Sequence, residues 1–198
     1  MMDPAAPPIE LRRVSKRFGD LVVLDEVDLV FPRGETTAVI GPSGTGKSVM
    51  LKHIVGLLRP DAGEVRVFGV DMAKAPERVL YQVRRRMGML FQDGALFDSL
   101  STGENIAFPL ARHRPDIKPR ERRERVDAVL EMVELPGLYD RPVSALSGGQ
   151  RKRVGLARAI VTEPEIVLFD EPNSGLDPMT SRSEEHTSEL QSHSDLVC

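Results

Sequence analysis

The sequence predicts an α/β fold in which a core of strands and helices is interrupted by a block of helices. Three patterns carry this prediction. Apolar and polar residues alternate over residues 9–31, as in paired antiparallel strands. An apolar run at 35–41 leads through a glycine-rich loop into a helical pattern. Helical periodicity then fills residues 101–160, and EIVLFDE at 165–171 returns to the pattern of a buried strand.

The composition is that of one globular domain with room for a small subdomain. The chain has 198 residues, of which 40% are hydrophobic, enough to build a core. The net charge of −3 gives no overall field that would favour nucleic acid as a partner. The single cysteine, Cys198, excludes a disulfide framework and fits a reducing compartment. We see neither a signal peptide nor a membrane span, so a membrane role is expected to need a partner subunit.

The first half of the chain is expected to hold strands and a helix that follows the glycine-rich loop. Turn residues Pro32-Arg33-Gly34 end the alternating strands. ETTAVIG at 35–41 is then expected to form a buried strand, and the apolar spacing of VMLKHIVGLL predicts a helix over 49–58. RPDAGEVRVFG at 59–69 predicts a turn and a strand, and MGMLFQ at 87–92 predicts another short buried strand.

The second half is expected to be helical until the last core strand. The segments ERVDAVLEMVEL and GQRKRVGLARAIV both have apolar residues at helical spacing. We therefore divide the chain into a nucleotide-binding core at 1–94, a helical subdomain at 95–160, a core strand with its following loop at 161–181, and a tail at 182–198.

The segment GPSGTGKS matches the pattern GxxxxGK followed by Ser or Thr. Its glycines let backbone N–H groups fold around phosphates at a helix N-terminus, Lys47 is expected to reach the β and γ phosphates, and Ser48 is expected to ligate Mg²⁺. The alternative is an ordinary glycine turn, but the flanking strand and helix are the context that phosphate binding requires. The predicted phosphate-binding residues are Gly41, Pro42, Ser43, Gly44, Thr45, Gly46, Lys47 and Ser48.

Two carboxylates end the last apolar strand. Asp170 is expected to lie near Mg²⁺ and Glu171 near an attacking water, which is the division of labour that phosphoryl transfer needs. A buried strand capped by two solvated acids is the plainer interpretation of this segment when it is taken alone.

The segment LSGGQRKRV from Leu146 decides the class. Ser147 and two glycines open a basic helix, so N–H groups and the helix dipole make an anion site there. One glycine-rich loop already satisfies its own nucleotide, so a second phosphate site implies a second chain. The order of these motifs over residues 9–181 resembles the ATP-binding subunits of ABC transporters, whose signature motif is LSGGQ.

The resemblance implies a P-loop NTPase core of the ABC ATPase type, with an antiparallel β subdomain and an inserted helical subdomain. It further implies ATP and Mg²⁺ as cofactors, ATP hydrolysis, and a head-to-tail dimer in which each signature closes over the ATP of the other subunit. Phe18 would stack on adenine, Gln92 would sense Mg²⁺ and the water, and Asp177 would link the two sites. The implied catalytic residues are Glu171, Lys47 and Gln92, the implied metal ligands are Ser48, Gln92 and Asp170, and the signature contributes Ser147, Gly148, Gly149 and Gln150.

The stretch 86–110, RMGMLFQDGALFDSLSTGENIAFPL, resembles the Mla and Mce type of phospholipid transport ATPase more closely. It implies transport of phospholipid or another lipid across the bacterial envelope, a polytopic permease partner, a lipid-binding periplasmic component, and a peripheral position on the cytoplasmic face of the inner membrane. The alternatives are an importer of amino acids or other small solutes and, from another class, a P-loop kinase or nucleotide switch without a membrane partner.

Two further features have simpler interpretations. The basic run at 111–125 contains acidic residues and lacks aromatics, so a solvated helical face is expected there rather than a nucleic-acid site. The four histidines show no metal-ligand spacing.

The tail at 182–198, RSEEHTSELQSHSDLVC, resembles the translation of a sequencing adapter in one reading frame. His186 follows Asp170 with no apolar strand between them, so we do not expect it to be the histidine that contacts the γ phosphate in this family. The fold is therefore expected to be incomplete at the C-terminus, without that histidine and the closing elements, and this loss is expected to weaken the folding or the activity of the chain as written.

Overall fold

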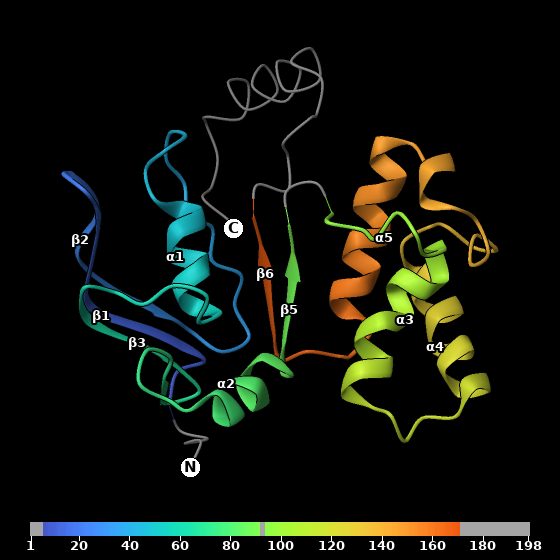
Figure 1. Cartoon of the computed structure of the whole chain (residues 1–198), viewed down its shortest axis with the longest axis horizontal. Helices are drawn as coiled ribbons and strands as arrows, with labels where there is room; N and C mark the ends of the chain where they lie inside the picture. The colour runs from blue at the N-terminus through green and yellow to red at the C-terminus, as the bar shows by residue number, and fades with distance from the viewer. Residues whose placement is uncertain (1–5, 92–93, 171–198) are drawn as a thin grey trace, which may run out of the picture.

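The computed structural model describes residues 6–91 and 94–170 and shows a mixed α/β fold with two sheets (Figure 1). The first sheet is antiparallel and has the order β2-β1-β3-β4. Its strands are β1 (Ile9–Phe18), β2 (Leu21–Phe31), β3 (Ala62–Val67) and β4 (Val70–Asp71). β1 and β2 form a hairpin around Gly19, so the antiparallel pair that the alternation predicted is confirmed.

The antiparallel sheet buries one face against helices. Ile9 and Leu11 on β1, and Val65 and Val67 on β3, are buried because alternate residues of a strand point to the same face. Val14 joins them after a shift of register between Leu11 and Val14. This face shares one apolar core with α1 (Lys47–Ile54) and α2 (Glu77–Arg84). The core positions the loop that precedes α1.

Two short parallel strands lie between the antiparallel sheet and the helical block (Figure 1). They are β5 (Met87–Leu90) and β6 (Ile166–Phe169), paired from Met87 with Ile166 to Leu90 with Phe169. Gly88 is required here, since a Cβ atom at that position would overlap the carbonyl oxygen of Ala159. The pair joins residues almost 80 positions apart and fixes the end of the second strand.

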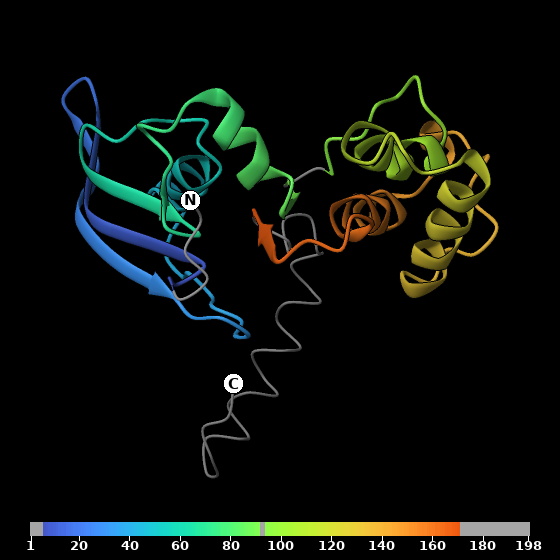
Figure 2. The ribbon, with the colours of Figure 1, turned by 90° about the horizontal axis from the view of Figure 1, so that it is seen from below.

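The helical block consists of α3 (Thr102–His113), α4 (Pro119–Met132), the short 3₁₀ helix η1 (Val143–Ala145) and α5 (Gly148–Ile160). Ser101 and Glu104 form a capping box at the start of α3, and Pro119 occupies the first turn of α4. The block has its own apolar core, which includes Ile106, Leu130 and Val154. Figure 2 shows it on the far side of β5 and β6 from the antiparallel sheet.

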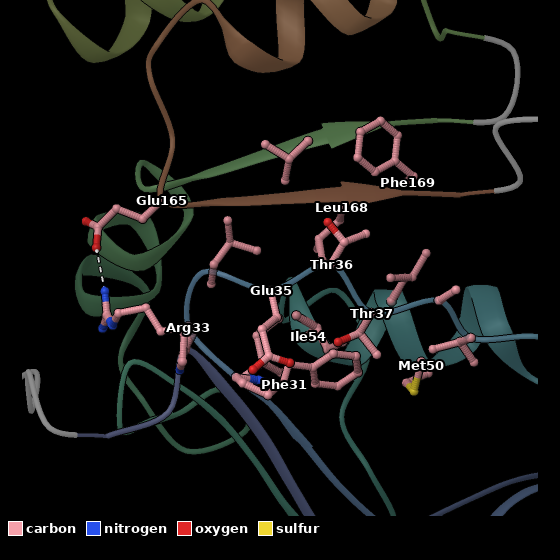
Figure 3. Close-up of a pocket in the computed structure, with 18 of the residues that line it drawn as sticks. Phe31, Arg33, Glu35, Thr36, Thr37, Met50, Ile54, Glu165, Leu168 and Phe169 are labelled. Carbon is pink, nitrogen blue, oxygen red and sulfur yellow. Dashed lines mark ion pairs between the residues drawn. The ribbon is translucent and has the colours of Figure 1, made fainter. Parts of the chain in front are cut away.

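The strand expected at 35–41 is not formed, so that prediction is wrong. Residues 35–40 have no regular secondary structure, and the side chain of Ile40 is 93% exposed. A cavity of about 590 Å³ lies between this segment and β6, with Thr36 on one wall and Leu168 on the other (Figure 3). An apolar run becomes a strand only when a neighbour completes its ladder of hydrogen bonds, and the cavity separates these two segments.

Several expectations fall outside the described residues. They concern Gln92, Glu171, Asp177 and the tail at 182–198. Among the helices that are described, none combines the length and the apolar character needed to cross a membrane.

Candidate functional site

The loop before α1 is shaped by two glycines in the left-handed region. Gly44 has φ +84° and Gly46 has φ +95°, conformations that side chains other than glycine rarely adopt. A Cβ atom on Gly46 would also lie 2.9 Å from the carbonyl oxygen of Val23, so the loop sits directly on β2. Gly46 is the N-cap of α1 and offers no side-chain hydrogen bond to the first turn. The first N–H groups of α1 are therefore left for an anion to accept.

Lys47 lies across this loop. Its Nζ donates hydrogen bonds to the carbonyl oxygens of Gly41 at 2.7 Å and Pro42 at 2.8 Å. Thr45 Oγ1 donates to the same Pro42 oxygen at 2.9 Å. The ammonium group is thereby held at the mouth of the loop, where a phosphate group would exchange for the two carbonyl oxygens.

Two predicted metal ligands meet although they are 122 positions apart. Ser48 Oγ donates to Asp170 Oδ1 at 2.7 Å. The backbone N–H of Asp170 donates to the carbonyl oxygen of Leu90 at 3.0 Å, so β5 holds the carboxylate in place. One hydroxyl and one carboxylate suit Mg²⁺, which keeps several waters and also binds the phosphates of its substrate. Among the described residues no group of three or more His, Cys, Asp or Glu side chains stands ready to hold a metal ion.

Phe18 borders the same loop. A hollow of about 180 Å³ is lined by Phe18 and Val23, by Gly44 and Gly46 of the loop, and by the first turn of α1 from Lys47 to Val49. The ring is 47% exposed, and Lys16 Nζ lies 5.5 Å from its centroid. A nucleotide whose base stacks on this ring would therefore have its phosphates in the neighbouring loop.

The larger cavity beside β6 has a different character. It touches Lys47 and Asp170 at its rim, but its walls are mainly the apolar side chains of β6 and α1 and the segment around Thr36 (Figure 3). Lys47 and Ser48 line the smaller hollow, so a phosphate group would find a cation and a hydroxyl there.

The signature segment lies apart from this loop. α1 and α5 stand on opposite sides of β5 and β6 (Figure 1). Ser147 Oγ accepts from the N–H of Gln150 at 3.2 Å, and Gln150 Oε1 accepts from the N–H of Ser147 at 2.9 Å. Ser147, Gly148 and Gly149 are exposed, so this helix N-terminus faces outward from the chain. The structure thus brings Phe18, the loop, Ser48 and Asp170 together, and leaves the signature on a separate surface.

The basic run at 111–125 is paired with acids. Arg114 contacts Asp116, Arg120 contacts Glu124, and Arg123 contacts both Asp127 and Asp140. Exposed pairs of this kind are typical of a solvated helical face.

Comparison with known proteins places these features in one family. The profile of the family described as "ABC transporter" matches residues 24–174. A solved dimeric ATP-binding cassette, in a post-hydrolysis state bound to ADP and Pi, has a TM-score of 0.78 and 34% identity, and the match covers 91% of this chain and 81% of that one.

Three of the relatives with similar sequences are ATP-binding proteins named for different substrates. The probable ribonucleotide transport ATP-binding protein mkl of Mycobacterium leprae (strain TN) is 46% identical over 176 residues, 89% of this chain and 50% of that protein. The intermembrane phospholipid transport system ATP-binding protein MlaF of Haemophilus influenzae (strain ATCC 51907 / DSM 11121 / KW20 / Rd) is 44% identical over 172 residues, 87% of this chain and 65% of that protein. The sulfate/thiosulfate import ATP-binding protein CysA of Mycolicibacterium paratuberculosis (strain ATCC BAA-968 / K-10) is 44% identical over 170 residues, 85% of this chain and 45% of that protein. The chain thus spans between 45% and 65% of the length of these relatives.

Proposed function

Because the chain belongs to the ABC transporter family, we propose that it is the subunit that binds and hydrolyses ATP to power a transporter. The observation that carries the proposal is the hydrogen bond between Ser48 Oγ and Asp170 Oδ1 at 2.7 Å. It places the end of β6 against the first turn of α1, so a carboxylate meets the loop that is shaped for phosphate. This combination serves phosphoryl transfer better than it serves a structural cap.

The residues of the loop have separable roles in the proposed reaction. The N–H groups at the start of α1 bind the phosphates, and Lys47 leaves the oxygens of Gly41 and Pro42 to neutralise the β and γ phosphates. Ser48 and Asp170 would hold Mg²⁺, which neutralises charge on the phosphate oxygens. Phe18 stacks on the adenine. Glu171, which follows Asp170 in the sequence, is proposed to orient the attacking water, and Gln92 to sense the metal and the water.

A second copy of the cassette is proposed to complete the site. Ser147, Gly148 and Gly149 are exposed at the N-terminus of α5, on the other side of β5 and β6 from α1. Each chain would therefore hold the phosphates of its own nucleotide in the loop before α1. Its N–H groups at the start of α5 would contact the phosphates held by the partner chain. A head-to-tail dimer, with Asp177 proposed at its centre, pairs each loop with the other chain's signature.

A membrane permease is the proposed second partner. Phe97 and Phe108 are 43% and 48% exposed, and their ring centroids are 4.9 Å apart. Two aromatic rings packed against each other at a tilt of 48° on an outer surface suit contact with another protein. The chain is accordingly proposed to sit at the cytoplasmic face of the inner membrane through the permease.

Phospholipid or another lipid is the proposed cargo, and a lipid-binding periplasmic component the proposed further partner. Support comes from the stretch 86–110 and from the 44% identity to a protein named for intermembrane phospholipid transport. A relative of similar identity is named for sulfate/thiosulfate import, so a small-solute importer is the competing proposal. Copurification with a permease and a lipid-binding component supports the lipid system, whereas a solute-binding protein in their place supports the importer.

Lys47→Ala tests the core of the proposal. We expect ATP binding to weaken about a hundredfold or more, because the substitution removes a positive charge from the phosphate site. Binding of a fluorescent ATP analogue is measured with and without Mg²⁺, followed by release of phosphate.

Lys52→Ala is the matched control, since it removes the same charge from an exposed position on the same helix. It is expected to bind ATP like the wild type. Equal binding by Lys47→Ala and the wild type contradicts the proposal. ATP binding without hydrolysis, in a chain that captures no polytopic membrane subunit, favours a nucleotide switch instead.

A further inference from the structure

A tight turn at residues 94–97 packs against the middle of α5. A Cβ atom on Gly155 would lie 3.0 Å from the Cα of Gly94 and 2.9 Å from Leu90 Cδ1. Gly94 itself has φ +74°, and a Cβ there would lie 3.2 Å from the carbonyl oxygen of Arg151. Both glycines are therefore needed for the turn and the helix to approach so closely.

Arg158 fastens this turn to α5. Its Nη2 donates to the carbonyl oxygen of Gly94 at 2.6 Å, and its Nη1 donates to that of Ala95 at 2.9 Å. The guanidinium carbon also lies 5.9 Å from the centroid of Phe97. Burial lowers the pKa of Arg158, and within residues 6–91 and 94–170 no carboxylate forms an ion pair with it.

A half-buried cation without a carboxylate is costly unless its donors are satisfied. Here two carbonyl dipoles and the face of a ring take the place of the carboxylate. The planar fork of arginine reaches two successive carbonyl oxygens, a geometry that a lysine ammonium does not match. The contact therefore fixes the orientation of the turn as well as its distance from the helix.

The other side of the turn is fastened to α3. Asn105 is fully buried, its Oδ1 accepts from the N–H of Phe97 at 2.8 Å, and its Nδ2 donates to the carbonyl oxygen of Phe97 at 3.0 Å. The backbone of Phe97 is thus held against α3, and its ring lies beside that of Phe108 on the same outer surface. The exposed aromatic pair is connected through this turn to the helix that begins at Ser147.

We propose that Arg158 is a positioning residue that couples the turn at 94–97 to α5, so that displacement of the aromatic pair displaces the signature end of the helix. Its role in turnover rests on the proposed function, because the turn begins two residues after Gln92 in the sequence and α5 begins at the predicted signature. The contact between the turn and the helix stands on the geometry alone.

Amide hydrogen exchange on the full chain tests the contact. Arg158→Met keeps the length and helix propensity of the side chain but removes its charge and donors. We expect exchange of the amides of residues 94–98 to rise about tenfold, with Arg158→Lys between this variant and the wild type, and the amides of α5 to be unchanged. Exchange within twofold of the wild type at residues 94–98, or an equal rise along α5, overturns the proposal.

ATP turnover tests the coupling. Arg158→Met is expected to lower kcat about tenfold and to leave KM for ATP within twofold, since its hydrogen bonds go to the turn and not to the phosphate loop; Arg158→Lys should recover part of kcat. Arg120→Met, at an exposed site on α4, is the control and should behave as the wild type. Unchanged kcat in Arg158→Met overturns the coupling. A wild-type chain that does not bind ATP rejects the proposed function, while the exchange result still decides the contact.

Discussion

Two helix N-termini in this chain have the motifs of phosphate sites, and they are built in opposite ways. α1 begins at Gly46, which offers no side-chain cap, after a loop that positive φ angles at Gly44 and Gly46 fold into shape. Ser147 is the N-cap of α5. Its side chain accepts from the backbone N–H of Gln150, and the side chain of Gln150 accepts from the backbone N–H of Ser147. The first end leaves its donors available, whereas the second has already partnered two of them.

Because of this difference in capping, the N-termini of α1 and α5 are expected to bind phosphate in different ways. At α1 the backbone is already arranged, so binding requires only that Lys47 change its hydrogen-bond partners. At α5 a phosphate must compete with the Ser147 hydroxyl and the Gln150 amide for the same N–H groups. The α1 end therefore suits tight binding within one chain, and the α5 end suits a reversible contact with a second chain.

Replacing a glycine at the N-terminus of α1 and one at the N-terminus of α5 by alanine should give the largest difference in ATP affinity. Gly46→Ala should weaken ATP binding at least about a hundredfold, because φ +95° and the 2.9 Å approach to Val23 oppose any Cβ atom. Gly149→Ala should bind ATP normally in the monomer, since no atom lies within 4 Å of its added Cβ. Titration of each variant with a fluorescent ATP analogue measures the contrast.

Gly149→Ala also reports on the second chain. It lies in a helix, where alanine is favoured over glycine by about 1 kcal/mol, so the variant should be slightly more stable. Its hydrolysis should nevertheless fall if a partner's nucleotide packs on this glycine. Hydrolysis equal to that of the wild type would argue that the α5 end meets no nucleotide.

Removal of the cap at α5 is expected to have a smaller effect. Ser147→Ala deletes the acceptor for the N–H of Gln150 and should cost about 1 kcal/mol of stability. For a chain of this length that is a fall of roughly 2–4 °C in Tm, measured by thermal unfolding followed by circular dichroism. A Tm equal to that of the wild type would show that the capping box contributes nothing and that the N–H groups of α5 are as available as those of α1.

Local motifs made most of the fold predictable. The antiparallel hairpin, α1, the helical block and β6 each have a periodicity of their own and were predicted from it, whereas α2 was not predicted. The strand at 35–41 could not be judged in this way, because an apolar run forms a strand only beside a partner, and a cavity lies between it and β6. The helix expected over 49–58 ends at Ile54, shortly before Gly56 at φ +71°.

The site was predictable in its residue types and less so in its contacts. The spacing within GPSGTGKS and EIVLFDE pointed to Ser48 and Asp170, and the structure places them 2.7 Å apart. The spacing of Ser147 and Gln150, S-x-x-Q, is typical of the capping box that the structure shows, although our sequence analysis did not predict it. Arg158 gave no signal, because one arginine among several basic residues in α5 shows its burial only after the helix is packed against residues 94–97.

The smallest expected effect comes from a substitution at Glu165, just before β6. The other end of β6 leads to Asp170 at the phosphate loop. Near its start, the hydrogen bond from Arg86 holds the pKa of Glu165 below its ordinary value of 4.5, with a weaker contribution from Arg33. The folded state therefore favours the carboxylate, so the pair stabilises the fold above about pH 4.5 and loses this effect as the pH falls through the lowered pKa.

Glu165→Gln should accordingly lower the free energy of unfolding at pH 7 by only about a few tenths of a kcal/mol, because the pair is exposed and screened by solvent. The difference from the wild type should shrink as the pH falls from about 4.5 through the lowered pKa, because the wild-type carboxyl becomes neutral over that range. Urea unfolding at pH 7 and pH 3.5 measures it. Glu163→Gln, whose carboxylate is 85% exposed and 3.6 Å from Arg125, is the matched control and should show a smaller difference at both values. A Glu165→Gln effect that is as large at pH 3.5 as at pH 7 would mean that the start of β6 is held by the shape of the side chain rather than by its charge.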